Sequence, residues 1–513
     1  MPESVVVAAV GLVLATVALG IRLGIHVGLQ PGGVDTWYFL ASAAELRRTK
    51  RLPIRLPQYL LQDPSESYPP GFIVFLALLP QRWLRRYFWL VSPLVDAAHL
   101  LLVYALTLRL TSSLLAAIVA GAVHALTPQL VSETRSLNPR AFGVLLNSIT
   151  MYLILRSVIP VPSTLTSHFG EHPWYLFALA ILFAAAVFLT TTGVAFVVAT
   201  ASLTVVLGDA RYLLLALAGL GSAVLLSGGL LLRVLANYVH AVRFWRRNLA
   251  FRGLHPILDS PIYGRGRSEP VSASAWVGGG IVRSTVRLVG ENPFLVPMLF
   301  VATPSLAVEW WGQQMYWWAV AILIWSFAVT FVRPLRVFGP GYQFMKASVM
   351  PTAFSLALLI DGNQGNRLLA WVILAVSFAL SVAAIGVLYV HLRARRSERT
   401  SSTPPGLTAT AEALSRAEGD GVLCLPPMYA DYVTFTSGKK VLWGGHSGDL
   451  SRFEAVHPVI RRPLEELIRE YRLEFVLLDL SYTDASQIRL AHRLREISRH
   501  GEFALYRVGP AGA

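Results

Sequence analysis

The sequence predicts an α-helical polytopic membrane protein with about eleven transmembrane helices and a small C-terminal α/β domain outside the membrane. Two observations predict the membrane part. The 513 residues are 54% hydrophobic and only 14% charged, whereas roughly a quarter of the residues in soluble domains are charged. The chain also holds many apolar runs near the length of about 20 residues that a helix needs to cross a bilayer. A more polar C-terminal stretch with short strand-like runs predicts the α/β domain.

The apolar runs are predicted to be helices because backbone polar groups in lipid must hydrogen-bond within the chain. The run from 173 to 208 is too long for one helix, and we divide it at 190–193, where "TTTG" favours a tight turn. The first run has neither a basic stretch before it nor a cleavage site, which predicts an uncleaved helix. The predicted spans are 5–24, 88–110, 112–128, 141–157, 174–190, 192–208, 212–232, 294–311, 315–332, 344–360 and 368–392.

The chain is predicted to divide into a transmembrane domain (1–396), a Ser/Thr/Pro-rich linker (397–411) and the α/β domain (412–513). Cys424 is the one cysteine, so the sequence predicts neither a disulfide framework nor a thiolate metal cluster. Within the α/β domain, the patterns predict strands at 421–426, 475–480 and 503–508, and helices at 461–472 and 485–500.

The formal net charge of +15 indicates an anionic partner. The arginines lie in loops beside the spans rather than on a soluble face, so we expect lipid phosphates and membrane lipids, not nucleic acid. With about eleven spans, the basic loops 32–70, 233–292 and 333–346 fall on the same side of the membrane as 130–140. Binding or chemistry is therefore expected on that side.

"GGVDTWYF", residues 32–39, places an acid and two aromatic residues just after the first span. Asp35 is a candidate catalytic carboxylate, and Trp37 and Tyr38 are candidates for stacking on a sugar. An N-cap role explains Asp35 equally well, because an aspartate before a helix stabilises it by about 1 kcal/mol.

"PSESYPPGF", residues 64–72, adds Glu66 and Tyr68 as candidate substrate-binding residues. An ordinary helix-initiating turn explains the two prolines better than it explains Glu66. The stretch therefore adds a second acidic and aromatic turn to the same side of the membrane.

"LVSETRSLNPRAFG", residues 130–143, carries Glu133, Arg135, Asn138 and Arg140 between two apolar runs. Charges at a membrane boundary are costly unless they are paired or functional. A Glu133–Arg140 salt bridge would leave Arg135 unexplained, whereas arginine also binds phosphate in a bidentate manner. Arg140 begins a predicted helix, where a cation is unfavourable and needs an anionic partner.

An acid after the first span, a second acid after the third, many spans and a C-terminal α/β domain resemble the GT-C glycosyltransferases, such as the protein O-mannosyltransferases and the aminoarabinose lipid A transferase. The resemblance implies a hexosyltransferase-type enzyme that uses a polyprenyl-phosphate sugar and a protein, lipid or glycan acceptor. It implies a plasma-membrane protein with a cytoplasmic N-terminus and an extracytoplasmic C-terminal domain. It maps the catalytic carboxylates onto Asp35 and Glu133. The stretch 332–351 resembles a late charged loop of these enzymes and adds the candidate substrate-binding residues Arg333, Arg336, Gln343 and Lys346.

The sequence departs from the family pattern in two places. "ETR", residues 133–135, replaces a DxD pair, so the metal requirement stays open, with a divalent cation as one option. "WWGQQ", residues 310–314, lacks the aspartate of the oligosaccharyltransferase motif, which argues against transfer of a preassembled glycan to asparagine. The positive-inside rule would place the basic loops in the cytoplasm. The rule applies best to short loops, and we follow the orientation that the resemblance implies.

The resemblance leads to an inverting displacement in which Asp35 removes the proton of the acceptor hydroxyl and Glu133 orients the acceptor or the sugar. Candidates for neutralising the leaving phosphate are Arg135, Arg140, Arg333 and Arg336. The alternatives are a flippase or transporter for lipid-linked glycans and a polysaccharide polymerase. A transporter should place ionisable residues near the bilayer midplane, where the predicted spans hold mainly Asp96, His99 and His124. An acid directly after the first span favours the transferase.

Overall fold

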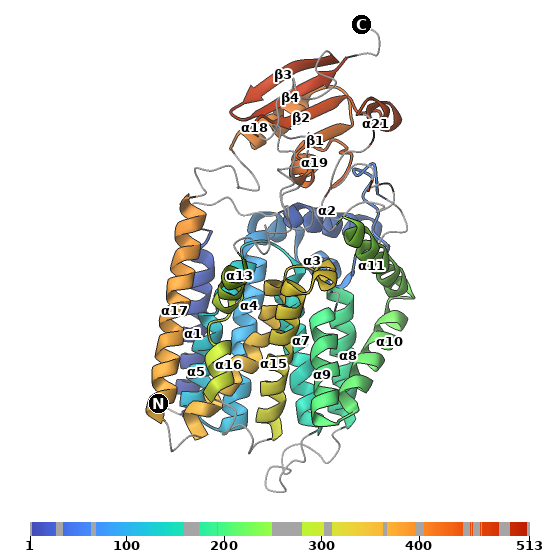
Figure 1. Cartoon of the computed structure of the whole chain (residues 1–513). Helices are drawn as coiled ribbons and strands as arrows, with labels where there is room; N and C mark the ends of the chain where they lie inside the picture. The colour runs from blue at the N-terminus through green and yellow to red at the C-terminus, as the bar shows by residue number, and fades with distance from the viewer. Residues whose placement is uncertain are drawn as a thin grey trace.

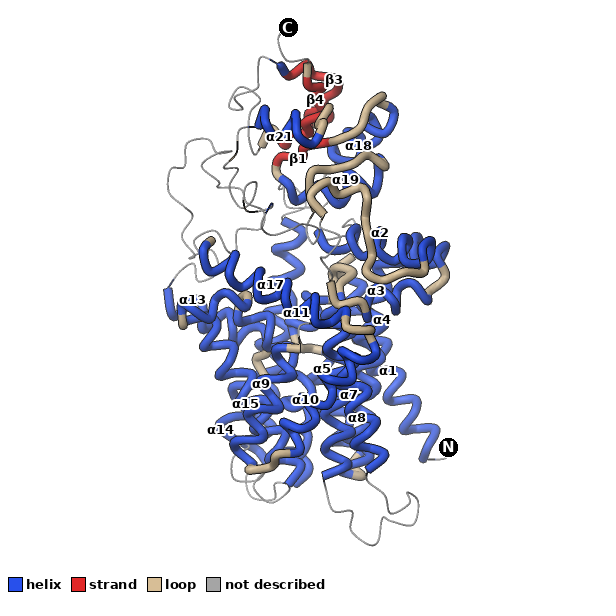
Figure 2. Tube along the Cα trace, turned by 90° about the vertical axis from the view of Figure 1, so that its right-hand side faces the viewer, coloured by secondary structure: helices blue, strands red, loops and turns tan. Residues whose placement is uncertain are grey.

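The computed structural model describes residues 3–26, 34–62, 68–158, 174–191, 193–248, 280–301, 310–362, 367–394, 405–444, 452, 454, 462, 464–481 and 493–509. A bundle of long helices carries the C-terminal domain at one end, and the chain begins at the opposite end of the bundle (Figure 1). The view at 90° shows the same two parts, with every strand in the C-terminal domain (Figure 2). Glu66 lies outside the described residues.

The main helices of the bundle run roughly side by side in Figure 1. They are α1 (Glu3–Gly24), α4 (Gln81–Thr111), α5 (Leu114–Ala125), α7 (Pro139–Val158), α8 (Trp174–Thr190), α9 (Val194–Leu207), α10 (Arg211–Leu226), α15 (Trp310–Phe331), α16 (Val349–Gly362) and α17 (Arg367–Ala394). Shorter elements connect them, and α2, α3, α11 and α13 lie at the end that carries the C-terminal domain. The shorter elements are α2 (Val34–Thr49), α3 (Gly71–Leu78), α6 (Pro128–Glu133), α11 (Leu230–Arg247), α13 (Gly280–Glu291), α14 (Leu295–Val301) and the 3-10 helices η3 (Arg333–Phe338) and η4 (Gly341–Ser348).

Within the described residues, five helices are long and apolar enough to cross a membrane, and the bent pair α10–α11 makes a sixth. Helices α5, α8 and α9 are apolar but shorter. Each predicted span overlaps a helix, but these lengths do not confirm a count of eleven. The predicted break at 190–193 is confirmed, because α8 ends at Thr190 and α9 begins at Val194. Gly193 between them has φ +65°, a conformation that residues with a side chain rarely adopt.

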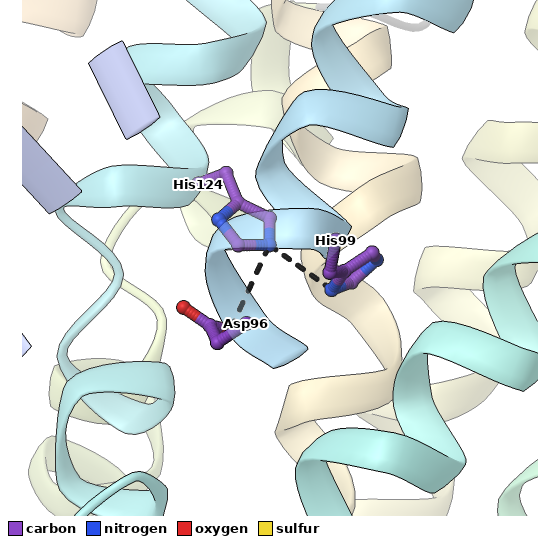
Figure 3. A group of neighbouring side chains, drawn as sticks. All are labelled: Asp96, His99 and His124. Carbon is purple, nitrogen blue, oxygen red and sulfur yellow. Dashed lines mark hydrogen bonds and ion pairs between the residues drawn. The ribbon is translucent and has the colours of Figure 1, made fainter. Parts of the chain in front are cut away.

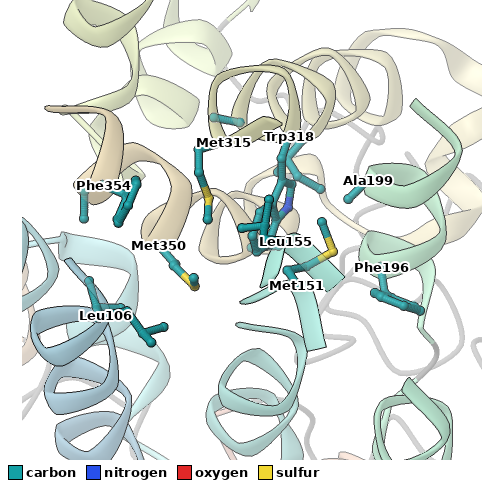
Figure 4. Close-up of a cluster of buried hydrophobic side chains, with 14 of the residues drawn as sticks. Leu106, Met151, Leu155, Phe196, Ala199, Met315, Trp318, Met350 and Phe354 are labelled. Carbon is teal, nitrogen blue, oxygen red and sulfur yellow. The ribbon is translucent and has the colours of Figure 1, made fainter. Parts of the chain in front are cut away.

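The core of the bundle is a cluster of apolar side chains that joins α4, α7, α9, α15 and α16 (Figure 4). Trp318 of α15 is its largest fully buried member. In lipid, close packing holds such helices together, because lipid tails are as apolar as the side chains. The labelled members in Figure 4 are Leu106, Met151, Leu155, Phe196, Ala199, Met315, Trp318, Met350 and Phe354.

The C-terminal domain contains a four-stranded sheet in the order β1-β2-β4-β3, with β1 and β2 parallel and the other neighbours antiparallel. Its elements are α18 (Pro405–Arg416), β1 (Val422–Leu425), η5 (Pro427–Tyr429), α19 (Ala430–Ser437), α21 (Leu464–Tyr471), β2 (Phe475–Asp479), β3 (Leu494–His500) and β4 (Phe503–Val508). Helix α18 begins inside the stretch predicted as linker, so the ordered domain starts earlier than the composition indicated.

The helix predicted at 485–500 is wrong over its last seven residues, which form β3. Leucine and isoleucine at helical spacing suggested a helix. The chain instead turns back at Gly501, whose φ is +60°, and β3 pairs antiparallel with β4. Pairing with the next strand of the chain therefore overrides the helical spacing of the apolar residues.

The loop after α2 is bound into the C-terminal domain. The backbone N–H groups of Leu60 and Leu61 donate to the carbonyls of Val441 and Leu442, both at 3.0 Å. The buried Tyr59 hydroxyl donates to Oδ1 of Asp431 at 2.6 Å. These bonds fix the C-terminal domain over the end of the bundle at which α2 lies.

Candidate functional site

Glu133, Arg140 and Lys346 form a buried charge cluster at the meeting point of α6, α7 and η4. Nη1 of Arg140 lies 3.0 Å from Oε2 of Glu133, and Nζ of Lys346 lies 3.3 Å from Oε1. The Glu133 side chain is only 8% exposed. Burial favours its protonated form, but the charges of Arg140 and Lys346 outweigh burial and lower the pKa of Glu133. Glu133 is therefore a carboxylate at neutral pH.

The Asn138–Pro139 turn builds this cluster. Oδ1 of Asn138 accepts a hydrogen bond from the backbone N–H of Arg140 at 2.8 Å, which caps the start of α7. Nδ2 of Asn138 donates to the carbonyls of Glu133 and Ser136, both at 3.1 Å. The amide of Asn138 therefore holds Glu133 and Arg140 in place. The structure thus gives Asn138 a scaffolding role, and its role in binding substrate stays a prediction.

Asp35 lies in the first turn of α2, where a carboxylate interacts favourably with the helix dipole. The charges of Glu133 and of Asp35 both stabilise the charged form of Arg140, so the two predicted acids lie around one arginine. Asp35 also acts on Tyr68, and burial, together with the neighbouring groups Tyr238 and Asp35, raises the pKa of Tyr68 well above its usual value. The structure thus brings together Asp35, Tyr68, Glu133 and Arg140 from four separate segments.

Trp37 and Tyr38 do not present their rings to a ligand. The Trp37 ring is 9% exposed and packs edge-on against Phe88 and Tyr432, with ring centroids 5.5 and 5.0 Å apart. Tyr38 is 6% exposed and contacts the ring of Tyr68. The bundle and the C-terminal domain thus enclose the Trp37 ring, and both residues have a packing role. Their stacking on a sugar stays a prediction.

The remaining predicted residues spread over a wider area. Arg135 is exposed, and its charge acts on His26. Arg333 is exposed at the start of η3, and Gln343 is half-buried in η4. Arg336 lies in a pocket of its own. The structure therefore does not gather the predicted arginines into one phosphate site.

That pocket lies between α13, α15, η3 and η4. Two guanidinium groups line it, those of Arg287 and Arg336. The Arg287 guanidinium lies 4.2 Å from the ring centroid of Tyr342, and Nε of Arg336 donates to the carbonyl of Thr330 at 3.1 Å. Ser284, also in the lining, has a buried hydroxyl with no hydrogen-bond partner among the described residues. Two guanidinium cations and a hydroxyl that can still donate a hydrogen bond are groups that bind an anion such as phosphate.

Glu291 connects the pocket with the charge cluster. It ends α13, one turn after Arg287, and it interacts electrostatically with Arg287, Glu133 and Lys346. Burial raises the pKa of Glu291 to about 7. Our sequence reasoning missed Glu291 and did not single out Arg287. The available signal was the spacing of Ser284, Arg287 and Glu291, which places three polar residues on one face of a helix.

A second group of buried charges lies within the bundle (Figure 3). Asp96, His99 and His124 bring three potential metal-binding atoms within 4.8 Å of one another. His124 Nε2 lies 3.0 Å from His99 Nδ1, and His99 Nε2 lies 2.8 Å from Oγ of Ser148. Nε of Arg22 lies 2.5 Å from Oδ2 of Asp96. A divalent cation would add two positive charges beside this buried guanidinium, which is unfavourable. We therefore assign the group a structural role that joins α1, α4, α5 and α7.

No protein-family model and no curated protein matches the sequence. Solved structures share the fold. ArnT from Cupriavidus metallidurans in the apo state is 13% identical, with a TM-score of 0.58 over 99% of both chains. The oligosaccharyltransferase AglB from Archaeoglobus fulgidus, in complex with an inhibitory peptide and a dolichol-phosphate, is 14% identical, with a TM-score of 0.54 over 98% of this chain and 74% of that chain. The chain therefore has the GT-C fold, as its resemblance to that superfamily predicted.

Proposed function

We propose that this protein is a membrane glycosyltransferase that moves a sugar from a polyprenyl-phosphate-linked donor to an acceptor hydroxyl. The observation that carries the proposal is the meeting of Asp35 and Glu133 around Arg140 beside a pocket with two arginines. The GT-C fold supports it, and the dolichol-phosphate bound to AglB supports a lipid phosphate as the donor carrier.

Charge balance favours the pocket over Arg140 as the proposed binding site of the donor phosphate. Two carboxylates, Asp35 and Glu133, offset the two cations Arg140 and Lys346. Among the described residues, neither Arg287 nor Arg336 forms an ion pair. These two arginines can therefore accept the charge that develops on the leaving phosphate, with little reorganisation.

In the proposed reaction, a hydroxyl oxygen of the acceptor attacks the anomeric carbon of the donor sugar. The bond from that carbon to the phosphate oxygen breaks, and the phosphate leaves with the electron pair. Asp35 takes the proton of the attacking hydroxyl, and Glu133, held by Arg140 and Lys346, orients a sugar or acceptor hydroxyl. Asp35 interacts with Arg140 of the Glu133 cluster, and Glu291 links this cluster to Arg287. Asp35 and Arg287 are thus the two ends of this series of charges, an arrangement that suits a base and a leaving phosphate on opposite sides of the sugar. Such a displacement inverts the anomeric centre.

We further propose that the reaction takes place at the extracytoplasmic face of the plasma membrane. The C-terminal domain would lie on that side, since it packs against α2, which carries Asp35. In this position the domain covers the site and is suited to selecting the acceptor.

The test is transfer or hydrolysis of radiolabelled polyprenyl-phosphate sugars by the purified protein in lipid nanodiscs. The Asp35→Asn variant should bind polyprenyl phosphate as the wild type does and should lose transfer about 100-fold or more, since it lacks the base. An exposed acid of α21, changed as Glu465→Gln, is the matched control and should leave the rate unchanged. Wild-type rates in Asp35→Asn would refute the catalytic role of Asp35.

A further inference from the structure

Glu291 lies between the arginine pocket and the charge cluster, and no role in the proposed reaction accounts for it. Directly after it, Nδ2 of Asn292 donates to Oγ of Ser348 at 3.0 Å, which fixes the end of α13 onto η4. Two residues before Ser348, Lys346 is bound to Glu133. The end of α13, which carries Glu291, is thus fixed to the element that carries Lys346.

The charged and titratable groups around Glu291 come from three elements. Arg287 acts on it from its own helix, Glu133 from α6, and Lys346 from η4. Tyr342 of η4 interacts with it as well. Among the described residues, α15 and α17, which also pack against α13, add no charged group to this set. Arg287 and Lys346 favour the ionised carboxyl, whereas burial and Glu133 favour the protonated one.

We propose that Glu291 takes up a proton when the phosphate of the lipid donor enters the pocket of Arg287 and Arg336. A phosphate beside Arg287 offsets the cation that stabilises ionised Glu291, and it adds a like charge nearby. Both changes favour the neutral carboxyl. By linkage, a ligand that promotes protonation binds more tightly as the pH falls. This inference rests on the proposed function, since it assumes that the donor phosphate occupies this pocket.

The direction in which donor affinity should change with pH follows from the pKa of Glu291 in the empty site, which is about 7. Well below pH 7 the carboxyl is already neutral, and donor affinity should not depend on pH. Well above pH 7 the empty site holds an ionised Glu291. Binding then requires either uptake of a proton by Glu291 or placement of the phosphate beside a carboxylate, and both lower the affinity. A coupling of one pKa unit corresponds to a loss of about tenfold in affinity.

The experiment measures the affinity of the full-length protein in nanodiscs for a polyprenyl methyl phosphate between pH 6 and 8.5. This diester has one fixed negative charge, whereas a phosphate monoester titrates with a second pKa of about 6 and would obscure the effect. We expect the wild type to lose about tenfold in affinity across this range. Glu291→Gln should bind at all pH values as tightly as the wild type does at pH 6. Glu465→Gln, the control on α21, should keep the wild-type pH dependence.

A second readout needs no variant, namely the uptake of protons by the wild type when it binds the diester at pH 7.5 in weak buffer. We expect net uptake of a fraction of a proton per ligand. A flat pH profile without proton uptake, or an unchanged pH profile in Glu291→Gln, would overturn the inference while leaving the donor site in place. If Arg287→Ala bound the diester as well as the wild type does, the donor site itself would be wrong, and this inference with it.

Discussion

Two groups of buried charges in this protein are built in opposite ways. The group of Arg22, Asp96, His99 and His124 lies inside the bundle and pairs its own charges, since Arg22 bonds Asp96 and the carbonyls of Ala18, His124 and Ala125. The group around Glu133 lies at the end of the bundle near α2. It adjoins a pocket in which, among the described residues, Arg287 and Arg336 form no ion pair and the Ser284 hydroxyl has no hydrogen-bond partner. The difference indicates that cations without an anionic partner, rather than burial of charge alone, mark a site for an anionic ligand.

Both groups join several helices, so both are expected to contribute to stability. Arg22 is 0% and Asp96 2% exposed, whereas Arg140 is 36% exposed. Water and ligands therefore reach one group and not the other. We expect substitutions in the first group to act on folding and substitutions in the second to act on binding and rate.

The largest effect on stability is expected for Arg22→Met. The change leaves the Asp96 carboxylate buried without its cation, which should cost about 3–5 kcal/mol. The double variant Arg22→Met/Asp96→Leu removes both charges and should recover most of that loss. Thermal unfolding in nanodiscs measures both. A single variant as stable as the wild type would mean that this group is not the closed structural network described here.

The next effect concerns binding. Arg287→Ala should weaken the affinity for polyprenyl phosphate by about 10- to 100-fold, because a charged hydrogen bond contributes roughly 1.5–3 kcal/mol. Arg283→Ala, an exposed arginine one turn earlier on the same helix, is the matched control and should change the affinity little. Equal losses in both variants would indicate general attraction between a basic surface and the lipid, rather than a pocket.

The smallest expected effect is the loss of stability at acid pH when Glu133 becomes protonated. The pKa of Glu133 is lowered, so its ion pairs stabilise the protein fully above its ordinary pKa of about 4.5 and are lost as the pH falls through the lowered value. We expect the melting temperature of the wild type to fall below pH 4.5 more than that of Glu133→Gln. Parallel pH profiles of the two proteins would show that Glu133 is not held as a carboxylate by Arg140 and Lys346.

The open site was partly predictable from the sequence. Asp35 and Glu133 both follow apolar spans that end on the same side, so their approach follows from membrane topology. The pairing of Glu133 with Arg140 follows from the unfavourable position of a cation at a helix start. Lys346 comes from a segment that local patterns cannot place next to Glu133, since more than 200 residues separate the two.

Other features could not be predicted from the sequence because they also depend on contacts between segments that are far apart in the chain. Trp37 looked available to a sugar because the C-terminal domain that covers it lies almost 400 residues further along the chain. The sequence did not reveal a partner for Arg287 or Glu291, because Tyr342, which interacts with both, belongs to a different segment. By contrast, the break between α8 and α9 depends only on a local glycine conformation, and the sequence located it correctly.

The most direct test of the account compares Asp35→Asn with Asp96→Asn in the same nanodisc preparation. Each variant is measured for its melting temperature and for transfer from a polyprenyl-phosphate sugar per folded molecule, at a temperature at which both are folded. We expect Asp35→Asn to keep the wild-type melting temperature and to lose transfer about 100-fold or more. We expect Asp96→Asn to melt at a much lower temperature but to transfer sugar at close to the wild-type rate. Full activity in Asp35→Asn, or loss of transfer in folded Asp96→Asn, would contradict the division between an open site and a closed network.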